Sequence, residues 1–409
     1  MKWPRLSRTT NNLYRSDFLL TIVVLVAGFV PFLLAPLRAQ ALGPDGRGEF
    51  AFFQASLSVI AAVSALGVRH AYYLHVVNSS DRYSLRGSRF NLVTTSFGLV
   101  AGVPLSLIAY NSISALCGIA VFVVAMGGSI YATVQIEVAN AQQKALRSRI
   151  GALAAVPAPV EVVGSVLLLI LERLTATTAM ITTIFAEIFR SFVAQWLRRR
   201  DKRLTRNSDL DLAQRFMKSA IKFAPATLVP LLVVNIDSLI YGALLPISYV
   251  GLYAVAKIAT TVLLLGAATM EGKFLRSVQK CGIGRTVGIS TLVLIPIGVL
   301  VAFTGFALVP PLFGAAFSAA AAAFPLTAVA GVFGAFYVWT SAACAQGGLY
   351  RSSFISALIV LGFISLGSIV VSNIGAVGVT IMGWPLVAAY FGGIIVTSVS
   401  LARRWSRIK

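Results

Sequence analysis

Unbroken apolar runs of about 20 residues constrain this chain more than any other feature of its sequence. Residues 18–37 and 250–270 are two examples. An α-helix rises about 1.5 Å per residue, so each run is long enough to cross an apolar core about 30 Å thick. Backbone groups in lipid need internal partners, which leaves helices or closed barrels, and barrel strands would alternate in polarity over about 10 residues. The sequence therefore predicts an all-α integral membrane protein.

The composition supports this fold class and argues against an enzyme. The chain is 58% hydrophobic and 11% charged, whereas a soluble domain is about 25% charged. Lipid is therefore expected to cover its surface. No Gly-x-x-x-x-Gly-Lys-Ser/Thr phosphate loop, Ser-His-Asp arrangement or metal-ligand spacing is recognisable. We expect no catalytic activity, no cofactor and no metal site.

Twelve transmembrane helices are predicted, six in each half of the chain. The predicted spans are residues 18–37, 50–68, 92–110, 113–136, 152–171, 174–196, 221–241, 250–270, 287–308, 320–344, 354–371 and 376–399.

Basic residues lie almost entirely on one side of these spans. The net charge is +21, with 34 Lys and Arg. With both termini on one side, that side holds the basic residues of both ends and of the connections near 82–89, 144–149, 198–206 and 273–285. The other side has little beyond Arg38, Arg47 and Arg173. This is the positive-inside pattern, which predicts cytoplasmic termini. The charge therefore indicates orientation, and we expect no nucleic-acid partner.

The two halves of the chain show a weak internal repeat. Residues 48–54 match residues 251–257 at an offset of 203, and residues 139–148 match residues 343–352 at an offset of 204. Chance similarity between short Gly- and Ala-rich strings is the alternative. Six helices per repeat keep both halves in the same orientation, with the substrate site expected between two lobes. We predict an N-terminal lobe (1–197), a basic cytoplasmic connection (198–218) and a C-terminal lobe (219–409).

Several blocks along the chain resemble a known family. They are residues 38–51, 235–242 with 250–257, 312–320 and 375–378. Together they are similar to the O-antigen or lipid-linked oligosaccharide flippases of the multidrug/oligosaccharidyl-lipid/polysaccharide (MOP) exporter superfamily. The resemblance implies a MATE-like fold of two six-helix lobes that open alternately to the two sides. It also implies movement of a polyprenyl-diphosphate-linked oligosaccharide to the outer leaflet of a bacterial inner membrane, for cell-surface polysaccharide biosynthesis.

Other functions remain open at this point. An ion-coupled drug or metabolite antiporter would have the same fold. A membrane glycosyltransferase would need a larger outer loop than the short ones predicted here, and a non-transporting scaffold is a further alternative. The partners expected of a flippase are its lipid-linked glycan, membrane lipids, and the glycan polymerase or ligase machinery.

Arg38, Lys257 and Gln54 are the candidate substrate-binding residues. Charges inside a membrane need partners or a watery cavity. Arg38 ends the first predicted helix and Lys257 lies inside the eighth, where both could contact a diphosphate. The alternatives are an interface-anchored Arg38, and a Lys257 that pairs with Asp237 for structure. Gln54 is the repeat counterpart of Lys257 and is expected to line the same cavity or to pack.

Three carboxylates are candidates for ion coupling or for cavity ion pairs. Asp237 lies near the end of the seventh predicted helix, and we favour a structural pair with Lys257. Glu161 has no cationic neighbour in sequence and is either a proton-coupling group or part of a helix contact. Glu187 lies three residues before Arg190, a spacing that favours an ion pair on one helix face.

Overall fold

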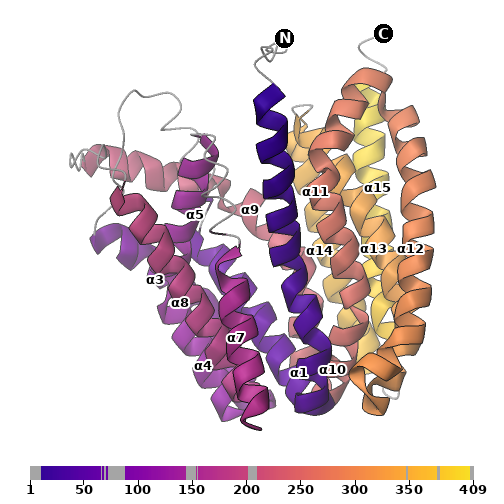
Figure 1. Ribbon diagram of the computed structural model, residues 1–409. Coiled ribbons are helices and arrows are strands. Elements are labelled where there is room, and N and C mark those ends of the chain that lie inside the picture. Colours follow the sequence, from indigo (N-terminus) through magenta and orange to yellow (C-terminus); the bar gives the residue numbers. More distant parts are fainter. Residues whose placement is uncertain are drawn as a thin grey trace.

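The computed structural model describes residues 11–65, 67–68, 71, 88–143, 153, 155–200, 210–346, 349–374 and 378–405. Every regular element in this described part is a helix (Figure 1). The first half of the chain contains α1 (Asn11–Ala65), α3 (Ser88–Ser112), α4 (Ala115–Met126), α5 (Gly128–Gln143), α7 (Pro157–Ile170) and α8 (Ala176–Arg200). The second half contains α9 (Leu210–Leu244), α10 (Ile247–Ala256), α11 (Ile258–Cys281), α12 (Ile283–Phe313), η1 (Ala315–Phe317), α13 (Ser318–Gln346), α14 (Tyr350–Asn373), η2 (Val379–Gly383) and α15 (Trp384–Trp405).

The predicted spans all fall on these helices, although fewer helices pass a strict membrane criterion. Within the described residues, seven helices are long and apolar enough to cross a membrane, or up to nine if each bent pair is one span. Two predicted spans, 18–37 and 50–68, lie largely within α1. The fifth predicted span coincides with α7, which is shorter. The prediction of an all-helical membrane fold is confirmed.

The structure differs from the predicted spans at three places: one predicted loop is helical, and two predicted spans are bent. The expected loop after Arg38 is helical, and α1 leaves helical geometry at Gly43 (φ 65°, ψ 179°), a conformation that glycine adopts without steric cost. The fourth predicted span bends by 51° between α4 and α5. The eighth bends by 42° between α10 and α11, so that Lys257 lies at a helix break.

The two ends of the chain lie at the same end of the bundle. The start of α1 and the end of α15 are both at the top of Figure 1, and we call this the termini end. The lower part of α1 and helix α10 lie at the opposite end. Many basic residues behind the orientation prediction, in 1–10, 72–87, 144–152, 201–209 and 406–409, are outside the described residues. Helices α8 and α9 extend into both ends of the predicted 198–218 connection.

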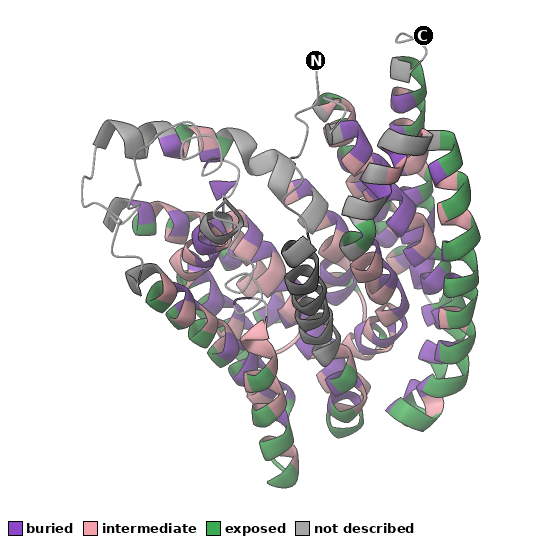
Figure 2. Cartoon of the chain, turned by 45° about the horizontal axis from the view of Figure 1, so that its top comes forward, coloured by how far each residue is buried: buried purple, intermediate pink, exposed green. Residues whose placement is uncertain are grey.

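Helices α1 and α9, which begin the two halves, join the cores of both. Ala35, Ala39 and Ala51 of α1 are buried in the apolar core of the second half. Leu239 of α9 is buried in the core of the first half. On the outside, α12 has an exposed apolar face at the right-hand edge of Figure 2, as expected of a surface in contact with lipid.

Candidate functional site

Lys257 and Asp237 form a buried ion pair in the second half of the chain. The break between α10 and α11 points Lys257 toward α9, and its Nζ lies 2.6 Å from Asp237 Oδ1. Nζ also donates to the Val234 carbonyl oxygen at 2.7 Å and to Ser238 Oγ at 3.1 Å. A lysine ammonium has three protons to donate. In this conformation, these three bonds use all of them.

The Asp237 carboxylate is also fully engaged. Its Oδ2 accepts a hydrogen bond of 2.5 Å from the Tyr253 hydroxyl, and Tyr253 packs edge-on against Tyr241. Asp237 has no solvent-exposed surface. A charge at such a site is tolerated when it is paired and hydrogen-bonded. The structure therefore brings Asp237 and Lys257 together, as the sequence suggested, in a neutral pair that fastens α9 to the α10–α11 break.

Arg38 and Glu161 form a second buried pair, in the first half. Arg38 Nη2 lies 3.1 Å from Glu161 Oε2, and the same guanidinium donates to Ser165 Oγ through Nε and Nη2. Arg38 is 1% exposed. Sequence reasoning gave Glu161 no cationic neighbour, because Arg38 is 123 positions away and only the packing of α1 on α7 joins them. Arg38 is therefore bonded to the neighbouring helix α7, and its side chain does not face lipid.

Arg47 is a buried cation that sequence reasoning left among the outer-side charges. Arg38 and Arg47 both lie over the Phe50 ring, with guanidinium carbons 5.0 Å and 5.7 Å from its centroid. Arg47 is 7% exposed, and its buried Nε has no hydrogen-bond partner among the described residues. The sequence analysis placed it on the outer side, between the predicted spans 18–37 and 50–68.

The Phe50 site, defined here as Arg38, Arg47, Phe50, Glu161 and Ser165, carries excess positive charge. Two arginines meet one carboxylate in it, counted over the residues that the structure describes. Guanidinium groups present planar donors that match phosphate and carboxylate oxygens. A buried guanidinium nitrogen without a partner is costly, and an anionic group would relieve that cost. The chemistry of the site therefore suits an anion.

The remaining candidates, Glu187 and Gln54, make no direct bond to either cluster among the described residues, although Glu187 interacts electrostatically with Glu161 of the Phe50 site. Glu187 and Arg190 form the expected pair, with Arg190 Nη1 3.4 Å from Glu187 Oε1. The Gln54 carbonyl oxygen accepts a bond from Ser58, and its side chain is half-buried on α1. The roles assigned to all six sequence candidates stay predictions.

The two halves meet at the end opposite the termini through glycines. A Cβ atom at Gly48 would overlap the Ile247 carbonyl oxygen and come within 2.9 Å of Gly251 N. A Cβ at Gly251 would overlap the Pro44 carbonyl oxygen and come within 2.9 Å of Gly48 N. Gly48 and Gly251 are 203 positions apart, and so are Pro44 and Ile247. This glycine contact is therefore pseudo-symmetric, with the spacing of the sequence repeat, and it leaves no room for any side chain.

Solved structures with the same overall fold are transporters. An inward-facing conformation of a multidrug resistance MATE family transporter of the MOP superfamily matches with a TM-score of 0.63 at 12% identity, over 94% of this chain and 98% of that chain. An outward-facing conformation of such a transporter gives 0.56 at 16% identity, over 95% and 94%. A MATE in complex with MaD5 gives 0.61 at 16% identity, over 95% and 94%.

These matches establish the fold over nearly the whole chain. At such identities the likeness extends to the fold alone, so the chain has a MATE-like fold, as predicted. No family model matches the chain. No curated protein matches it either.

Proposed function

We propose that this protein is a transporter that moves a polyprenyl-diphosphate-linked oligosaccharide from the inner to the outer leaflet of a bacterial inner membrane by alternating access. The excess positive charge of the Phe50 site is the observation that carries this proposal. A diphosphate is a compact anion with many acceptor oxygens, which arginine pairs bind well. A cationic drug would be repelled by the same site.

The closed end of the bundle suits a state that awaits substrate from the cytoplasm. The glycine contact holds α1 against α10 at the end opposite the termini. The inward-facing MATE structure superposes on this chain with a TM-score of 0.63, against 0.56 for the outward-facing one. With cytoplasmic termini, as the charge pattern predicts, the closed end is the outer side. Substrate enters between the halves from the cytoplasmic leaflet, and the glycine contact separates to release it outward.

Glu161 pairs with one of the two arginines of the Phe50 site in this conformation. It holds Arg38 through one salt bridge, and Ser165 adds two hydrogen bonds. An arriving diphosphate competes with Glu161 for Arg38 and supplies the missing partner of Arg47. At Arg38 the substrate diphosphate thereby replaces the Glu161 carboxylate. The arginine keeps an anionic partner throughout, so no unpaired charge is exposed to the membrane interior.

Lys257 has a different part in this scheme. Its three donors are all occupied in the closed conformation, where Asp237 balances its charge, so it positions the α10–α11 break. Direct contact with a phosphate would require that its bond to Asp237 or to a neighbouring oxygen be broken.

The test is a depletion experiment with complementation. Cells depleted of the protein are supplied with the wild type, with Arg47→Met or with the control Arg173→Met, which changes an exposed arginine. Lipid extracts are then quantified by mass spectrometry for polyprenyl-diphosphate glycans, together with the surface glycan. We expect depleted and Arg47→Met cells to accumulate complete lipid-linked units and to lose surface glycan. Unchanged lipid intermediates with altered tolerance to cationic drugs would instead identify an antiporter.

A further inference from the structure

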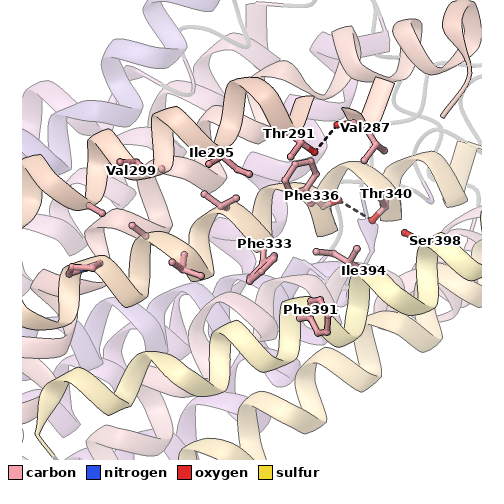
Figure 3. Close-up of a pocket in the computed structure, with 16 residues that line it drawn as sticks. Val287, Thr291, Ile295, Val299, Phe333, Phe336, Thr340, Phe391, Ile394 and Ser398 are labelled. Atoms are coloured by element: carbon pink, nitrogen blue, oxygen red, sulfur yellow. Dashed lines mark hydrogen bonds between the residues drawn. The ribbon is translucent and has the colours of Figure 1, made fainter. Parts of the chain in front are cut away.

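A cavity of about 530 Å³ lies on the outer flank of the second half, away from the glycine contact. Helices α12 and α15 both pack on α13, and the cavity lies between them (Figure 3). Its walls include Val287 and Val299 of α12, Phe333 and Phe336 of α13, and Phe391 of α15. Its volume is within the range of sites that hold whole small molecules, about 300–1,000 Å³.

Water is a poor occupant of this cavity. The Thr291 hydroxyl donates to the Val287 carbonyl oxygen at 2.9 Å, and the Thr340 hydroxyl donates to that of Phe336, also at 2.9 Å (Figure 3). Thr340 Oγ1 also accepts from Thr397 at 2.8 Å. A buried water needs two to four polar partners, and Thr291, Thr340 and Ser398 are the only polar side chains among the lining residues. The surrounding aromatic and aliphatic side chains cannot hydrogen-bond to water, so the cavity favours a hydrocarbon chain.

The cavity has the length and position of one lipid chain. Between Val287 and Val299 the helix rises about 18 Å, which is close to the depth of one leaflet, about half of a 30 Å core. Val287 and Ser398 lie at one end of the cavity and Val299 at the other (Figure 3). Ser398 is close to the end of α15, which lies at the termini end. The side chains of α12 around it, such as Leu292 and Phe303, are exposed as lipid-facing residues are. A chain from the leaflet on the termini side can therefore enter from the surrounding bilayer.

Basic residues lie near the ends of two of the helices that form the cavity. Arg285 is exposed in the first turn of α12, two residues before Val287, and Arg403 is exposed near the end of α15, beyond Ser398. An arginine near the membrane surface attracts anionic headgroups. We propose that this cavity is a binding site for an anionic glycerophospholipid of the leaflet on the termini side, with one acyl chain along α12 and its headgroup at Arg285.

A phospholipid fits this site better than the isoprenoid tail of a transported substrate. The Phe50 site belongs to the first half of the chain, whereas the cavity lies on the flank of the second. The two sites are built from different helices, α1 and α7 for the Phe50 site and α12, α13 and α15 for the cavity. The proposed site is thus independent of the proposed function, and a failure of one leaves the other standing.

Native mass spectrometry of the purified full-length protein tests this. Delipidated protein is titrated with dioleoyl phosphatidylglycerol or dioleoyl phosphatidylcholine, and the retained lipid is measured. We expect phosphatidylglycerol to be retained about fivefold better, and Arg285→Gln to remove that preference, which is the effect of one arginine near an anionic headgroup. Ala302→Trp fills the half-buried middle of the cavity and should lower retention of both lipids by about tenfold, as losing roughly two buried methylenes would.

Matched controls decide between this site and general lipid adhesion. Leu300→Trp adds the same ring on the lipid-facing side of α12, and Arg351→Gln removes an exposed arginine at the start of α14. Both should retain lipid as the wild type does. If Ala302→Trp melts below the wild type, the smaller change Thr291→Leu takes its place. Equal losses in the controls, no loss in the filled variant, or displacement of phosphatidylglycerol by polyprenyl phosphate would each overturn the proposal.

Discussion

At the scale of single residues, hydrogen-bond capacity decides what each buried charge can do. Lys257 has three protons and three acceptors, and Asp237 accepts from both Lys257 and Tyr253. Arg47 has a buried nitrogen for which the described residues provide no acceptor. Satisfied groups hold a fold together, whereas an unsatisfied buried donor needs another explanation. The first pair is therefore structural in this conformation, and Arg47 is the residue whose partner is expected to come from outside the chain.

Removing one member of the Asp237–Lys257 pair should destabilise the protein strongly. Asp237→Asn leaves an ammonium buried without its counter-charge, and we expect a loss of about 3–5 kcal/mol. The double variant Asp237→Asn with Lys257→Met should recover much of this. Unfolding in detergent, followed as a double-mutant cycle, measures both. Glu187→Gln serves as the comparison, because the Arg190–Glu187 distance is longer than that of the Lys257–Asp237 pair, 3.4 Å against 2.6 Å, and we expect a smaller loss. Additive effects in the cycle would contradict a coupled pair.

Replacing Arg47 should lower transport without lowering the stability of the protein. Arg47→Met removes a buried charge that lacks a full set of partners, so the unfolding midpoint should stay the same or rise. Export of the lipid-linked glycan should fall by about 10- to 100-fold, the effect of losing one charge-assisted contact. Arg47→Lys should restore part of it, since lysine keeps the charge and loses the planar fork. Wild-type export by Arg47→Met would exclude this residue from the substrate path.

At the scale of helices, glycines decide where the chain bends and where its halves touch. Gly43 lets α1 turn at the end opposite the termini, and the turn places Gly48 against Gly251. Because each glycine meets the carbonyl oxygen four residues before the other, the two helices approach at backbone distance. Because even one methyl group would prevent a contact this close, we expect α1 and α10 either to touch fully at these glycines or to separate.

Adding a methyl group at the glycine contact should hold the outer side open. Gly48→Ala or Gly251→Ala puts a Cβ into a backbone carbonyl, at a cost of about 1–3 kcal/mol in the closed state alone. Spin labels at Arg173→Cys and Leu312→Cys, both exposed on that end, in a background without native cysteines, should move apart. Gly362→Ala is the control, because a Cβ there meets nothing within 4 Å. An unchanged distance distribution in both glycine variants would refute the closure.

At the scale of the whole molecule, the orientation of the bundle in the membrane decides the direction of transport. The start of α1 and the end of α15 share one end, and the basic residues predict that this end is cytoplasmic. Reversal of the bundle would place the closed glycine contact in the cytoplasm and invert the proposed direction of entry.

Reporter fusions should settle the orientation. Alkaline phosphatase, which is active only outside the cytoplasm, should be inactive when fused after Lys409 and active when inserted after Arg173, between α7 and α8. A fluorescent protein fused after Lys409 should fold and fluoresce. The opposite pattern would show that the termini face outward, and the proposed inward-facing assignment would then have to be reversed.

Local properties were sufficient for the sequence to determine the fold class. The length of the apolar runs, the placement of Lys and Arg, and a repeat of about 200 residues are all visible in the sequence itself. The contact between Gly48 and Gly251 has the 203-residue offset of that repeat. The pairing of Asp237 with Lys257 could also be predicted, because a short turn joins their helices. Glu187 and Arg190 are three residues apart on one helix, which fixes their contact locally.

Tertiary structure alone decided the partners that lie far apart in sequence. Arg38 meets Glu161 across 123 positions because α1 packs on α7, and the burial of Arg47 depends on the turn at Gly43. The helix break at Lys257 could not be predicted either, because the residue at the break is neither a proline nor a glycine. Hydropathy is uniform along such helices, so it reports that a segment lies in the membrane and carries no information about which face meets which neighbour.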